Sequence, residues 1–596
     1  MNTLANNLIV FLVLLPMAMG LLCVPLVNFP RLCRAIGVLS FGGTFALATA
    51  LLIAIGCDCD GPGILVSQMG GWAAPYGITL VFDSLSGLML AGASLVALGT
   101  FVFGFGSLSP RTERRYFHPL VNLMMFGINM SFLTGDLFNL FVAFEIMLMA
   151  SYGLLVIGGG RAQLRQAYKY VVLNLLASAV FVIGAGMAYG MFGTLNMADL
   201  ARIAGGLAAQ GQLPTGFTAL GVLLLFVFTL KAGVFPLWFW LPDTYPTCPI
   251  NIAALFGGVL TKVGLYAIAR TFSLIFFNGD GADQVLIPIL AVGAAATMLV
   301  GVLGTLAYPN LRRVLSLVLV VGVGYALLGI AVNSAAGLAG AAFYMVQSMV
   351  VVAALFLCCG LLERATGGDE IGRMGALLQN PRLIGLGILF FIGLLSVVGL
   401  PPTSGFAGKL LIIRESLTPR FWLVGTTALV VGGLTLLAAV RTWGTTFWGP
   451  PPPPEVSQAA GDEQERGNET GEDAGAGDTP ETTTASPAEW WGAITLTAAS
   501  LLIGVLGQPV LATADRAGQQ LQNPTAYIQA VLNNPAYAED RQAFATAQKK
   551  AKAEYQKAKY DSKKHDKNGD KQQKTHKPGV QVDPQGSPRE AEASHD

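Results

Sequence analysis

The chain has 596 residues, of which 53% are hydrophobic and 12% are charged, and its formal net charge is +1. Soluble globular domains carry about twice that fraction of charged residues. This composition excludes an ordinary soluble enzyme, and the near-neutral charge gives no overall attraction for nucleic acid. Apolar runs of about 20 residues, the length that crosses a bilayer, recur along most of the chain.

These runs predict an all-α polytopic membrane protein, because helices satisfy their own backbone hydrogen bonds inside hydrocarbon. The first run, Asn7 to Val27, lacks a basic leader and a cleavage site, so we interpret it as a retained span. In total we expect about fourteen spans, near residues 8–27, 35–56, 82–106, 116–134, 137–157, 167–190, 217–240, 251–275, 284–305, 312–333, 338–361, 382–414, 421–446 and 488–510.

The domain organisation follows from these spans. Residues 1–446 hold transmembrane helices 1–13, and residues 488–510 hold helix 14. Between them, residues 447–487 are proline-rich and then acidic, which predicts a disordered loop. Residues 511–596 form a polar tail that we expect to be helical in part and then unstructured.

Basic residues favour alternate connections between the spans. They occur as Arg31 and Arg34, as Arg111, Arg114 and Arg115, as Arg161, Arg165 and Lys169, as Arg312 and Arg313, and as Arg364, Arg373 and Arg382. Cytoplasmic loops are enriched in Lys and Arg. The pattern therefore predicts that both termini face the extracytoplasmic side.

Four charged residues lie inside predicted spans, namely Glu145, Lys231, Lys262 and Lys409. A charge near the bilayer centre costs about 2.5–3.5 kcal/mol on insertion scales, so such residues usually line a cavity, pair or function. The alternatives are that a Glu–Lys pair only fixes helix register, or that a lysine extends to the interface. We favour a functional role for all four residues.

Helix-breaking residues lie close to two of these lysines. Pro236 and Pro242 interrupt the seventh span, and Pro401 and Pro402 interrupt the twelfth. Broken helices at membrane depth occur where they line a cavity or are buried in protein. Two such helices five spans apart indicate two related five-helix halves, about residues 116–275 and 284–446, which we interpret as an inverted repeat.

Buried amines next to a carboxylate can hold or release a proton as nearby charges move. We therefore predict a proton path in which Glu145 pairs with Lys231, and Lys262 and Lys409 carry the proton onward. Asp83 and Asp136, at the starts of spans, are interpreted as N-caps. The aromatic cluster Trp238–Trp240 is interpreted as an interface anchor.

No motif for soluble catalysis is present. The sequence has no phosphate loop, nucleotide fingerprint, Ser-His-Asp arrangement or set of cysteine ligands. We therefore expect no enzyme activity, no metal and no cofactor in this chain. Any redox chemistry would belong to partner subunits.

Four segments resemble a known family. They are Leu133–Tyr152 (LTGDLFNLFVAFEIMLMASY), Phe235–Pro246 (FPLWFWLPDTYP), Ala254–Ala267 (ALFGGVLTKVGLYA) and Gly399–Lys409 (GLPPTSGFAGK). They resemble the fifth, seventh, eighth and twelfth helices of the D subunit of Mrp-type multisubunit cation/proton antiporters. The wider family includes antiporter-like subunits of respiratory complex I and of membrane-bound hydrogenases.

The resemblance implies fourteen helices in two inverted five-helix repeats, with helices 7 and 12 broken. It implies a Glu–Lys pair at Glu145 and Lys231, a central Lys262 and an exit-side Lys409. It also implies a bacterial cytoplasmic (inner) membrane location, with other membrane subunits, the lipid bilayer, protons and monovalent cations as partners.

The second half departs from the family pattern. Val318, Gln347, Ser348 and Val352 stand where the family usually has histidine, lysine or other polar residues. Apolar side chains organise a water chain poorly, so the path from Lys262 to Lys409 is expected to be dry or to run elsewhere.

Three functions remain open at this stage. The first is a subunit of a Na⁺ (or other monovalent cation)/H⁺ antiporter. The second is a proton-pumping membrane arm of a complex I-like oxidoreductase, a hydrogenase or an inorganic-carbon uptake complex. The third is a largely structural, degenerate antiporter-like subunit.

Overall fold

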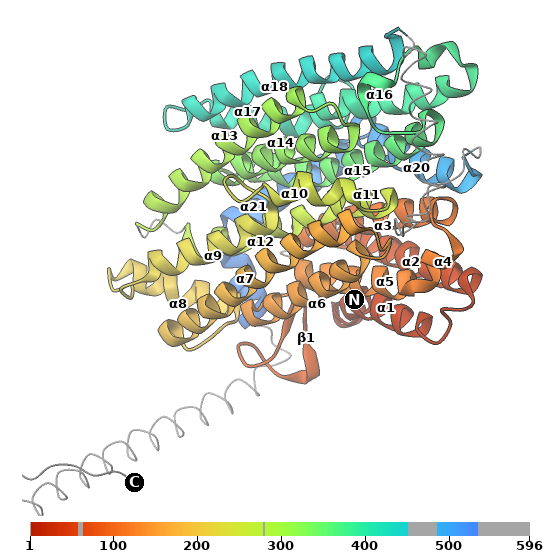
Figure 1. The fold of residues 1–596 in the computed structure, drawn as a ribbon. Coiled ribbons are helices and arrows are strands. Elements are labelled where there is room, and N and C mark those ends of the chain that lie inside the picture. The colour runs from red at the N-terminus through yellow and green to blue at the C-terminus, as the bar shows by residue number, and fades with distance from the viewer. Residues whose placement is uncertain (1, 58–62, 278–280, 451–484, 534–596) are drawn as a thin grey trace, which may run out of the picture. The chain divides into compact units, whose positions relative to one another are not determined.

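The computed structural model describes residues 2–57, 63–277, 281–450 and 485–533 (Figure 1). Most of the predicted acidic loop, and the predicted tail from residue 534 onward, lie outside the described residues. Within these ranges, twelve helices are long and apolar enough to cross a membrane, and a shorter apolar helix spans Phe217–Ala232. The predicted all-α polytopic class is confirmed.

The first part of the chain supplies α1 to α12, which build one side of the bundle. Their bounds are α1 Asn2–Cys23, α2 Pro30–Cys57, α3 Ser84–Ser107, α4 Pro110–Thr112, α5 His118–Leu133, α6 Leu137–Leu155, α7 Arg161–Phe192, α8 Met197–Ala209, α9 Phe217–Ala232, α10 Trp240–Thr244, α11 Ile250–Leu255 and α12 Thr261–Thr271. A wider π-helical segment, Phe256–Leu260, joins α11 to α12, so the helix continues without a gap.

The remaining helices follow from residue 283. Their bounds are α13 Asp283–Ala307, α14 Leu311–Val332, α15 Ala335–Thr366, α16 Ile384–Val398, α17 Gly405–Ser416, α18 Trp422–Trp443, α20 Pro487–Val505, α21 Gln508–Gln522 and α22 Pro524–Leu532. The helix expected over 488–510 therefore ends at Val505. Part of the expected polar tail is helical as α21 and α22, and α21 packs against α15 and α3.

The only strands among the described residues form a hairpin between α2 and α3. Strand β1 (Leu65–Gln68) pairs antiparallel with β2 (Thr79–Phe82), and Leu65 lies opposite Phe82. β2 is completely buried, and Asp83 directly after it caps α3 by accepting a hydrogen bond from the Ser86 backbone. The hairpin thus fixes where α3 begins.

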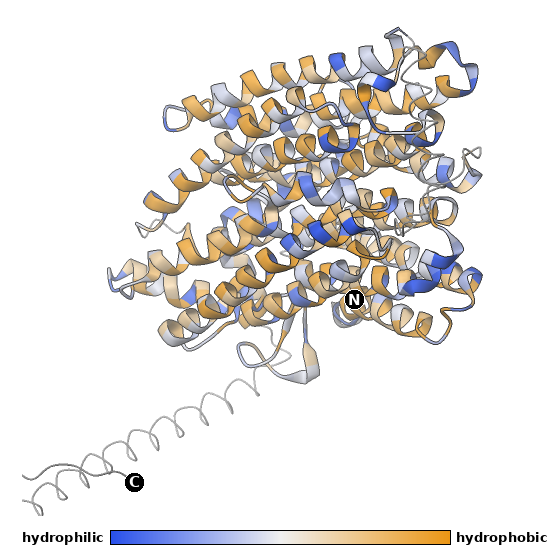
Figure 2. Cartoon of the chain, viewed as in Figure 1, coloured by the Kyte–Doolittle hydropathy of each residue, from blue (hydrophilic) through white to orange (hydrophobic). Residues whose placement is uncertain are grey.

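Three segments form the centre of the bundle. The apolar windows of Ile250–Phe276, α14 and α15 are entirely buried, whereas about a third of the corresponding window is buried in α1, α2 and α20. α14 packs between α13 and α15, and α15 also contacts α17, α20 and α21. In Figure 2 most of the helical ribbon has the colour of hydrophobic residues, with some hydrophilic segments within the bundle and at its right-hand end.

The basic connections meet at one end of the helices. Arg34 binds Glu113, Arg364 binds both Glu489 and the carbonyl oxygen of Gly106, and Arg312 binds Glu363. The end that carries these ion pairs is called the arginine-rich face below. α7 begins at Arg161, so Arg161, Arg165 and Lys169 lie in a helix rather than in the expected connection.

Candidate functional site

Lys231 lies at the end of a broken helix. α9 ends at Ala232 because Gly233 adopts a left-handed conformation (φ 74°) and Pro236 follows. The next helix, α10, begins only at Trp240. Lys231 is 5% exposed, and its Nζ donates a hydrogen bond to Asn174 Oδ1 of α7 at 3.2 Å.

Glu145 of α6 also contacts α7. Its Oε1 accepts a hydrogen bond from the hydroxyl of Ser178, which is also buried. Asn174 and Ser178 are four residues apart on α7, hence one above the other on one helix face. Among the described contacts, no ion pair within 4.0 Å joins Glu145 to Lys231. Each has its own polar partner on α7.

Lys262 lies at an interruption of a different kind. It is 1% exposed, and its Nζ donates to the carbonyl oxygen of Gly257 at 2.9 Å. Gly257 belongs to the π-helical segment, where the wider turn disturbs the regular ladder of backbone hydrogen bonds. The bulge therefore offers the lysine a buried acceptor.

The helices that carry Lys262 and Lys231 cross close to these two residues. A Cβ atom at Gly264 would lie 2.7 Å from the backbone nitrogen of Ala232, so only glycine allows α12 and α9 to approach this closely. Gly264 is two residues after Lys262, and Ala232 directly follows Lys231. The structure thus places Glu145, Lys231 and Lys262 within one group of neighbouring helices.

Lys409 occupies the second break. α16 ends at Val398, and α17 begins at Gly405, with Pro401 and Pro402 between them. Lys409 Nζ donates to the carbonyl oxygens of Val397 (2.7 Å) and Val398 (3.0 Å). These carbonyls belong to the last turn of α16, where helix geometry leaves acceptors free and concentrates partial negative charge.

An aromatic ring also contacts Lys409. Its Nζ lies 4.5 Å from the centre of the Tyr325 ring, and Tyr325 donates its hydroxyl to the carbonyl oxygen of Ala428 at 2.6 Å. A cation over an aromatic face is stabilised by the ring quadrupole. Lys409 is therefore held in a buried site whose ligands are all uncharged.

The four departures from the family pattern are all buried. Val318 of α14 and Gln347, Ser348 and Val352 of α15 are each less than 9% exposed. Gln347 donates to the carbonyl oxygen of Ser396 at 3.3 Å, while its own Oε1 has no hydrogen-bond partner. Polar groups therefore remain between Lys262 and Lys409, although two of the four positions are apolar.

Two residues of this site were not predicted from the sequence. Asn174 and Ser178, with Tyr170, recur every four residues along α7, whose other faces carry exposed apolar side chains such as Leu176 and Ile183. This spacing marks one polar stripe on an otherwise apolar helix. The signal was present in the sequence, but these residues are uncharged.

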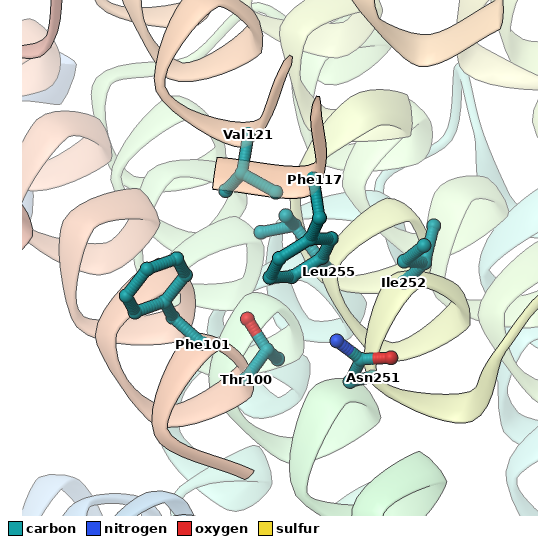
Figure 3. A pocket seen from close by; sticks show the side chains of 7 residues that line it. All are labelled: Thr100, Phe101, Phe117, Val121, Asn251, Ile252 and Leu255. Atoms are coloured by element: carbon teal, nitrogen blue, oxygen red, sulfur yellow. The ribbon is translucent and has the colours of Figure 1, made fainter. Parts of the chain in front are cut away.

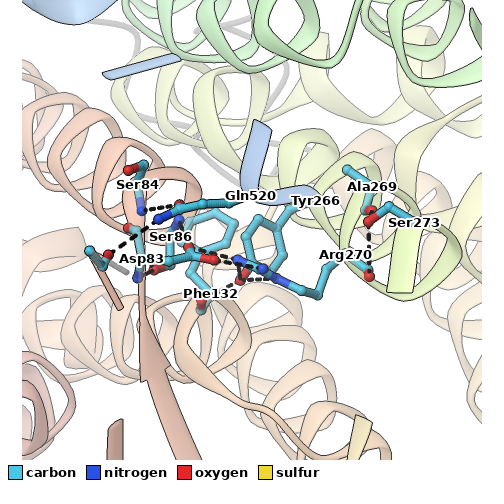
Figure 4. A network of polar contacts seen from close by, with 10 residues as sticks. Asp83, Ser84, Ser86, Phe132, Tyr266, Ala269, Arg270, Ser273 and Gln520 are labelled. Carbon is cyan, nitrogen blue, oxygen red and sulfur yellow. Dashed lines mark hydrogen bonds and ion pairs between the residues drawn. The ribbon is translucent and has the colours of Figure 1, made fainter. Parts of the chain in front are cut away.

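A buried ion pair at the opposite end from the arginine-rich face was also missed. Arg270 of α12 contacts Asp83 through both guanidinium nitrogens, at 2.6 Å and 2.7 Å (Figure 4). The two side chains are 3% and 1% exposed. Tyr266 lies beside Arg270 and donates its hydroxyl to the carbonyl oxygen of Phe132 at 2.6 Å. A charged residue inside a predicted span was the available signal.

The structure also tests the roles predicted for two aspartates and for the aromatic cluster Trp238–Trp240. Asp83 and Asp136 are N-caps, as predicted, of α3 and α6. The interface role expected for Trp238–Trp240 is wrong for Trp240, which is 2% exposed because its ring packs against Tyr170 and Tyr245.

A further buried carboxylate lies at the arginine-rich face. Glu113 accepts two hydrogen bonds from Arg34, at 2.7 Å and 2.8 Å, and His118 Nε2 lies 2.9 Å from its Oε1. Burial raises the pKa of Glu113, but the hydrogen bonds and positive charge of His118 and Arg34 outweigh burial and lower the pKa to about 2. Through Glu113, these contacts connect Arg34 of α2 with His118 at the start of α5.

A small pocket near this group is apolar and lies apart from the lysines. Phe101, Phe117 and Leu255 line it, and Asn251 lies at its edge (Figure 3). Its interior is too narrow to hold a water molecule. The pocket offers no charged group to a ligand, so we do not count it as part of the site.

The fold and these buried groups define a multi-pass helical membrane protein with ionisable side chains at helix interruptions. The family model described as NADH:quinone oxidoreductase/Mrp antiporter, transmembrane, matches residues 134–435. The chain belongs to this family. The matched range contains Glu145, Lys231, Lys262 and Lys409.

Two bacterial relatives match almost end to end. The D subunit of the Na(+)/H(+) antiporter of Alkalihalophilus pseudofirmus is 37% identical over 529 residues, which cover 88% of this chain and 99% of the relative. The corresponding D subunit of the Na(+)/H(+) antiporter of Bacillus subtilis is 36% identical over 528 residues, with the same coverage.

Solved structures show the same fold. A chain of the Mrp complex from Dietzia sp. DQ12-45-1b matches with a TM-score of 0.77 and 32% identity, over 89% of this chain and 100% of that chain. A chain of an archaeal membrane-bound sulfane sulfur reductase matches with a TM-score of 0.73 and 23% identity, over 88% of this chain and 99% of that chain. A chain of Thermus thermophilus respiratory complex I matches with a TM-score of 0.67 and 24% identity, over 86% of this chain and 100% of that chain. These two share the fold alone.

Proposed function

We propose that this chain is the D-type subunit of a multisubunit Na⁺/H⁺ antiporter and that Glu145, Lys231, Lys262 and Lys409 carry its protons. The observation that supports this most is the α7 stripe, on which Ser178 holds Glu145 and Asn174 holds Lys231. The near full-length similarity to the D subunits of two Na(+)/H(+) antiporters supports the same function.

The geometry suits proton transfer better than scaffolding. A buried charge with only a structural role is normally paired directly with an opposite charge, as Asp83 is with Arg270. Glu145 and Lys231 instead have neutral partners, and so do Lys262 and Lys409. A neutral acceptor such as a carbonyl oxygen binds an ammonium group without fixing its charge permanently, so protonation remains changeable.

The assembly and orientation belong to the same proposal. Partner membrane subunits would complete the antiporter, in the cytoplasmic membrane, with protons moving inward as cations move outward. We place the arginine-rich face in the cytoplasm, following the distribution of basic residues, so that both chain termini lie on the extracytoplasmic side. The membrane-arm alternative has weaker support, because relatives from redox complexes share less than 25% identity.

The test is Na⁺-dependent proton release from everted vesicles that contain the complete complex in an antiporter-deficient host. Respiration acidifies the vesicle interior, and added Na⁺ dissipates the pH gradient. Lys231→Ala and Glu145→Gln should each abolish this response. Arg202→Ala, which removes an exposed charge paired with Asp199 of its own helix, should retain it. Normal exchange by Lys231→Ala would refute the proposal.

A further inference from the structure

The segment that follows the break after Lys231 carries buried polar groups that lie outside the proposed proton site. Trp240, Thr244 and Tyr245 are each at most 2% exposed. The indole nitrogen of Trp240 and the hydroxyls of Thr244 and Tyr245 have no hydrogen-bond partner. Burying an unpaired polar group costs about 1–3 kcal/mol, so three such groups in six residues require an explanation.

These groups adjoin the α7 stripe. The Tyr170 ring packs against Trp240 with ring centres 5.2 Å apart, and Trp240 in turn packs against Tyr245 at 5.8 Å. The Tyr170 hydroxyl lies 3.1 Å from the Ser151 hydroxyl of α6. Tyr170 is one turn from Asn174, and its carbonyl oxygen accepts a hydrogen bond from the Asn174 amide at 2.8 Å.

α6 connects the same cluster to Glu145. Tyr152 follows Glu145 by seven residues, so the two lie on one face of the helix. The Tyr152 hydroxyl is buried and has no hydrogen-bond partner, and the Tyr152 ring packs against the Tyr170 ring at 5.5 Å. Hydroxyl groups therefore run from the α10 segment to the neighbourhood of the carboxylate.

The other end of the cluster reaches the arginine-rich face. Asp243 lies between Trp240 and Thr244 in sequence and is 39% exposed, 3.4 Å from Lys169. The segment is held in place because Arg312 donates to the carbonyl oxygens of Pro246 (2.9 Å) and Cys248 (2.8 Å). Solvent thus lies one residue away from the buried hydroxyls.

We propose that the hydroxyls of Tyr152, Tyr170, Thr244 and Tyr245 form the route by which protons pass between the arginine-rich face and Glu145. This inference rests on the proposed function and names the access route of the same site. A hydroxyl accepts a hydrogen bond and donates its own, so a row of them, with intervening water, passes a proton without any change in oxidation state. We call these four residues the hydroxyl row.

The opposite end of α12 is unsuited to this task. Between Lys262 and that end lies Arg270, whose charge is held by Asp83. A directly bonded ion pair occupies that end, whereas the four residues of the hydroxyl row are uncharged, which favours access to Glu145 from the arginine-rich face.

The experiment measures proton uptake from that face. Everted vesicles with the complete complex are loaded with Na⁺ and diluted into Na⁺-free buffer, so that antiport draws protons from the arginine-rich face into the lumen. Tyr170→Phe and the double variant Thr244→Val/Tyr245→Phe keep the shape of the cluster and remove its hydroxyls. We expect uptake to fall about tenfold or more in alkaline buffer.

The difference in proton uptake between these variants and the wild type should decrease as the external buffer is acidified. At lower pH, the higher proton concentration compensates for the slower route. A structural role would not give this one-sided dependence on pH. The matched control is Tyr527→Phe, which removes a hydroxyl that is likewise buried and without a hydrogen-bond partner, on a ring that packs against Arg270. It should exchange like the wild type. The amount of assembled complex in the membrane is measured for every variant.

Two outcomes would overturn the proposal. One is wild-type uptake at all pH values by the hydroxyl-row variants while Lys231→Ala remains inactive, which leaves the proposed function intact. The other is a deficit that does not change with external pH. If the Lys231→Ala variant exchanges normally, the proposed function itself fails. That result can be told apart from the two outcomes that contradict only the hydroxyl row.

Discussion

Asn174 and Ser178 lie one turn apart on α7, and they hold Lys231 and Glu145, respectively. The carboxylate and the amine are therefore connected through two neutral side chains of a third helix, not through a direct ion pair. A direct pair would favour the charged form of both groups. The amide of Asn174 and the hydroxyl of Ser178 therefore stand where a direct ion pair would otherwise join the two groups.

The first prediction concerns this bridge. Asn174→Asp would place a carboxylate 3.2 Å from the lysine amine, at the position of the present amide oxygen. The added charge would hold the proton on Lys231, so we expect cation-driven proton movement to slow by about tenfold or more. Everted vesicles measure the rate.

Matched variants separate charge from packing. Asn174→Ala removes the acceptor without adding charge and should slow exchange less than Asn174→Asp. Ser131→Ala removes a buried hydroxyl that bonds only the carbonyl oxygen of Gly127 in its own helix, and it should have no effect. Equal rates for Asn174→Asp and Asn174→Ala would contradict the charge argument.

The sequence was sufficient to find the ionisable residues, because a charge in an apolar run is conspicuous. Lys231, Lys262 and Lys409 are all at most 5% exposed, and the first and last lie beside helix breaks marked by proline. Their partners were not predictable in the same way. Two of the three lysines bind backbone carbonyl oxygens, which every residue has.

Other features depend on contacts between distant segments. The π-helical turn at Gly257 has no proline or similar signal in the sequence. Arg270 was overlooked because its partner, Asp83, lies 187 residues away. α21 packs against α15 and α3, contacts that composition does not reveal, so its segment was predicted only as part of a polar tail.

The second prediction concerns the Asp83–Arg270 pair. Arg270→Met should destabilise the protein by about 3–5 kcal/mol, because it leaves Asp83 buried without a counter-charge. The melting temperature of the purified complex in detergent measures this loss. Asp83→Asn/Arg270→Met removes both charges and should recover part of the lost stability. A double variant as unstable as Arg270→Met would show that the unpaired charge is not the cause.

The third prediction concerns pH and the Glu113 carboxylate. Its pKa is lowered from 4.5 to about 2 in the folded state, which corresponds to stabilisation on the order of 3 kcal/mol. Because the folded-state pKa is the lower one, this contribution is complete above pH 4.5 and is lost as the pH falls toward 2.

The measurement compares the unfolding of wild type and Glu113→Gln in detergent as a function of pH. We expect a constant difference in stability between neutral pH and about pH 5, then a decrease on further acidification. A difference that already shrinks close to neutral pH would contradict the assignment of this stability to the low pKa of Glu113.

The last prediction concerns the apolar stretch between Lys262 and Lys409. Val352 Cγ1 lies 3.4 Å from where a Cβ of Gly257 would be, next to the carbonyl oxygen that binds Lys262. Ser348 lies one turn before Val352 in α15. Threonine has nearly the shape of valine but carries a hydroxyl. If protons pass here, Val352→Thr should speed exchange, since it adds a hydroxyl at a buried apolar position of the proposed path.

Faster exchange by Val352→Thr would be informative because a polar substitution at a buried site normally only destabilises the folded protein. The control is Val350→Thr, which places the same hydroxyl on the opposite side of α15, where Val350 is fully buried. It should leave the rate unchanged or lower it through reduced assembly. Faster exchange by Val352→Thr alone would place the path along this face of α15, whereas no gain would mean that protons leave Lys262 by another route.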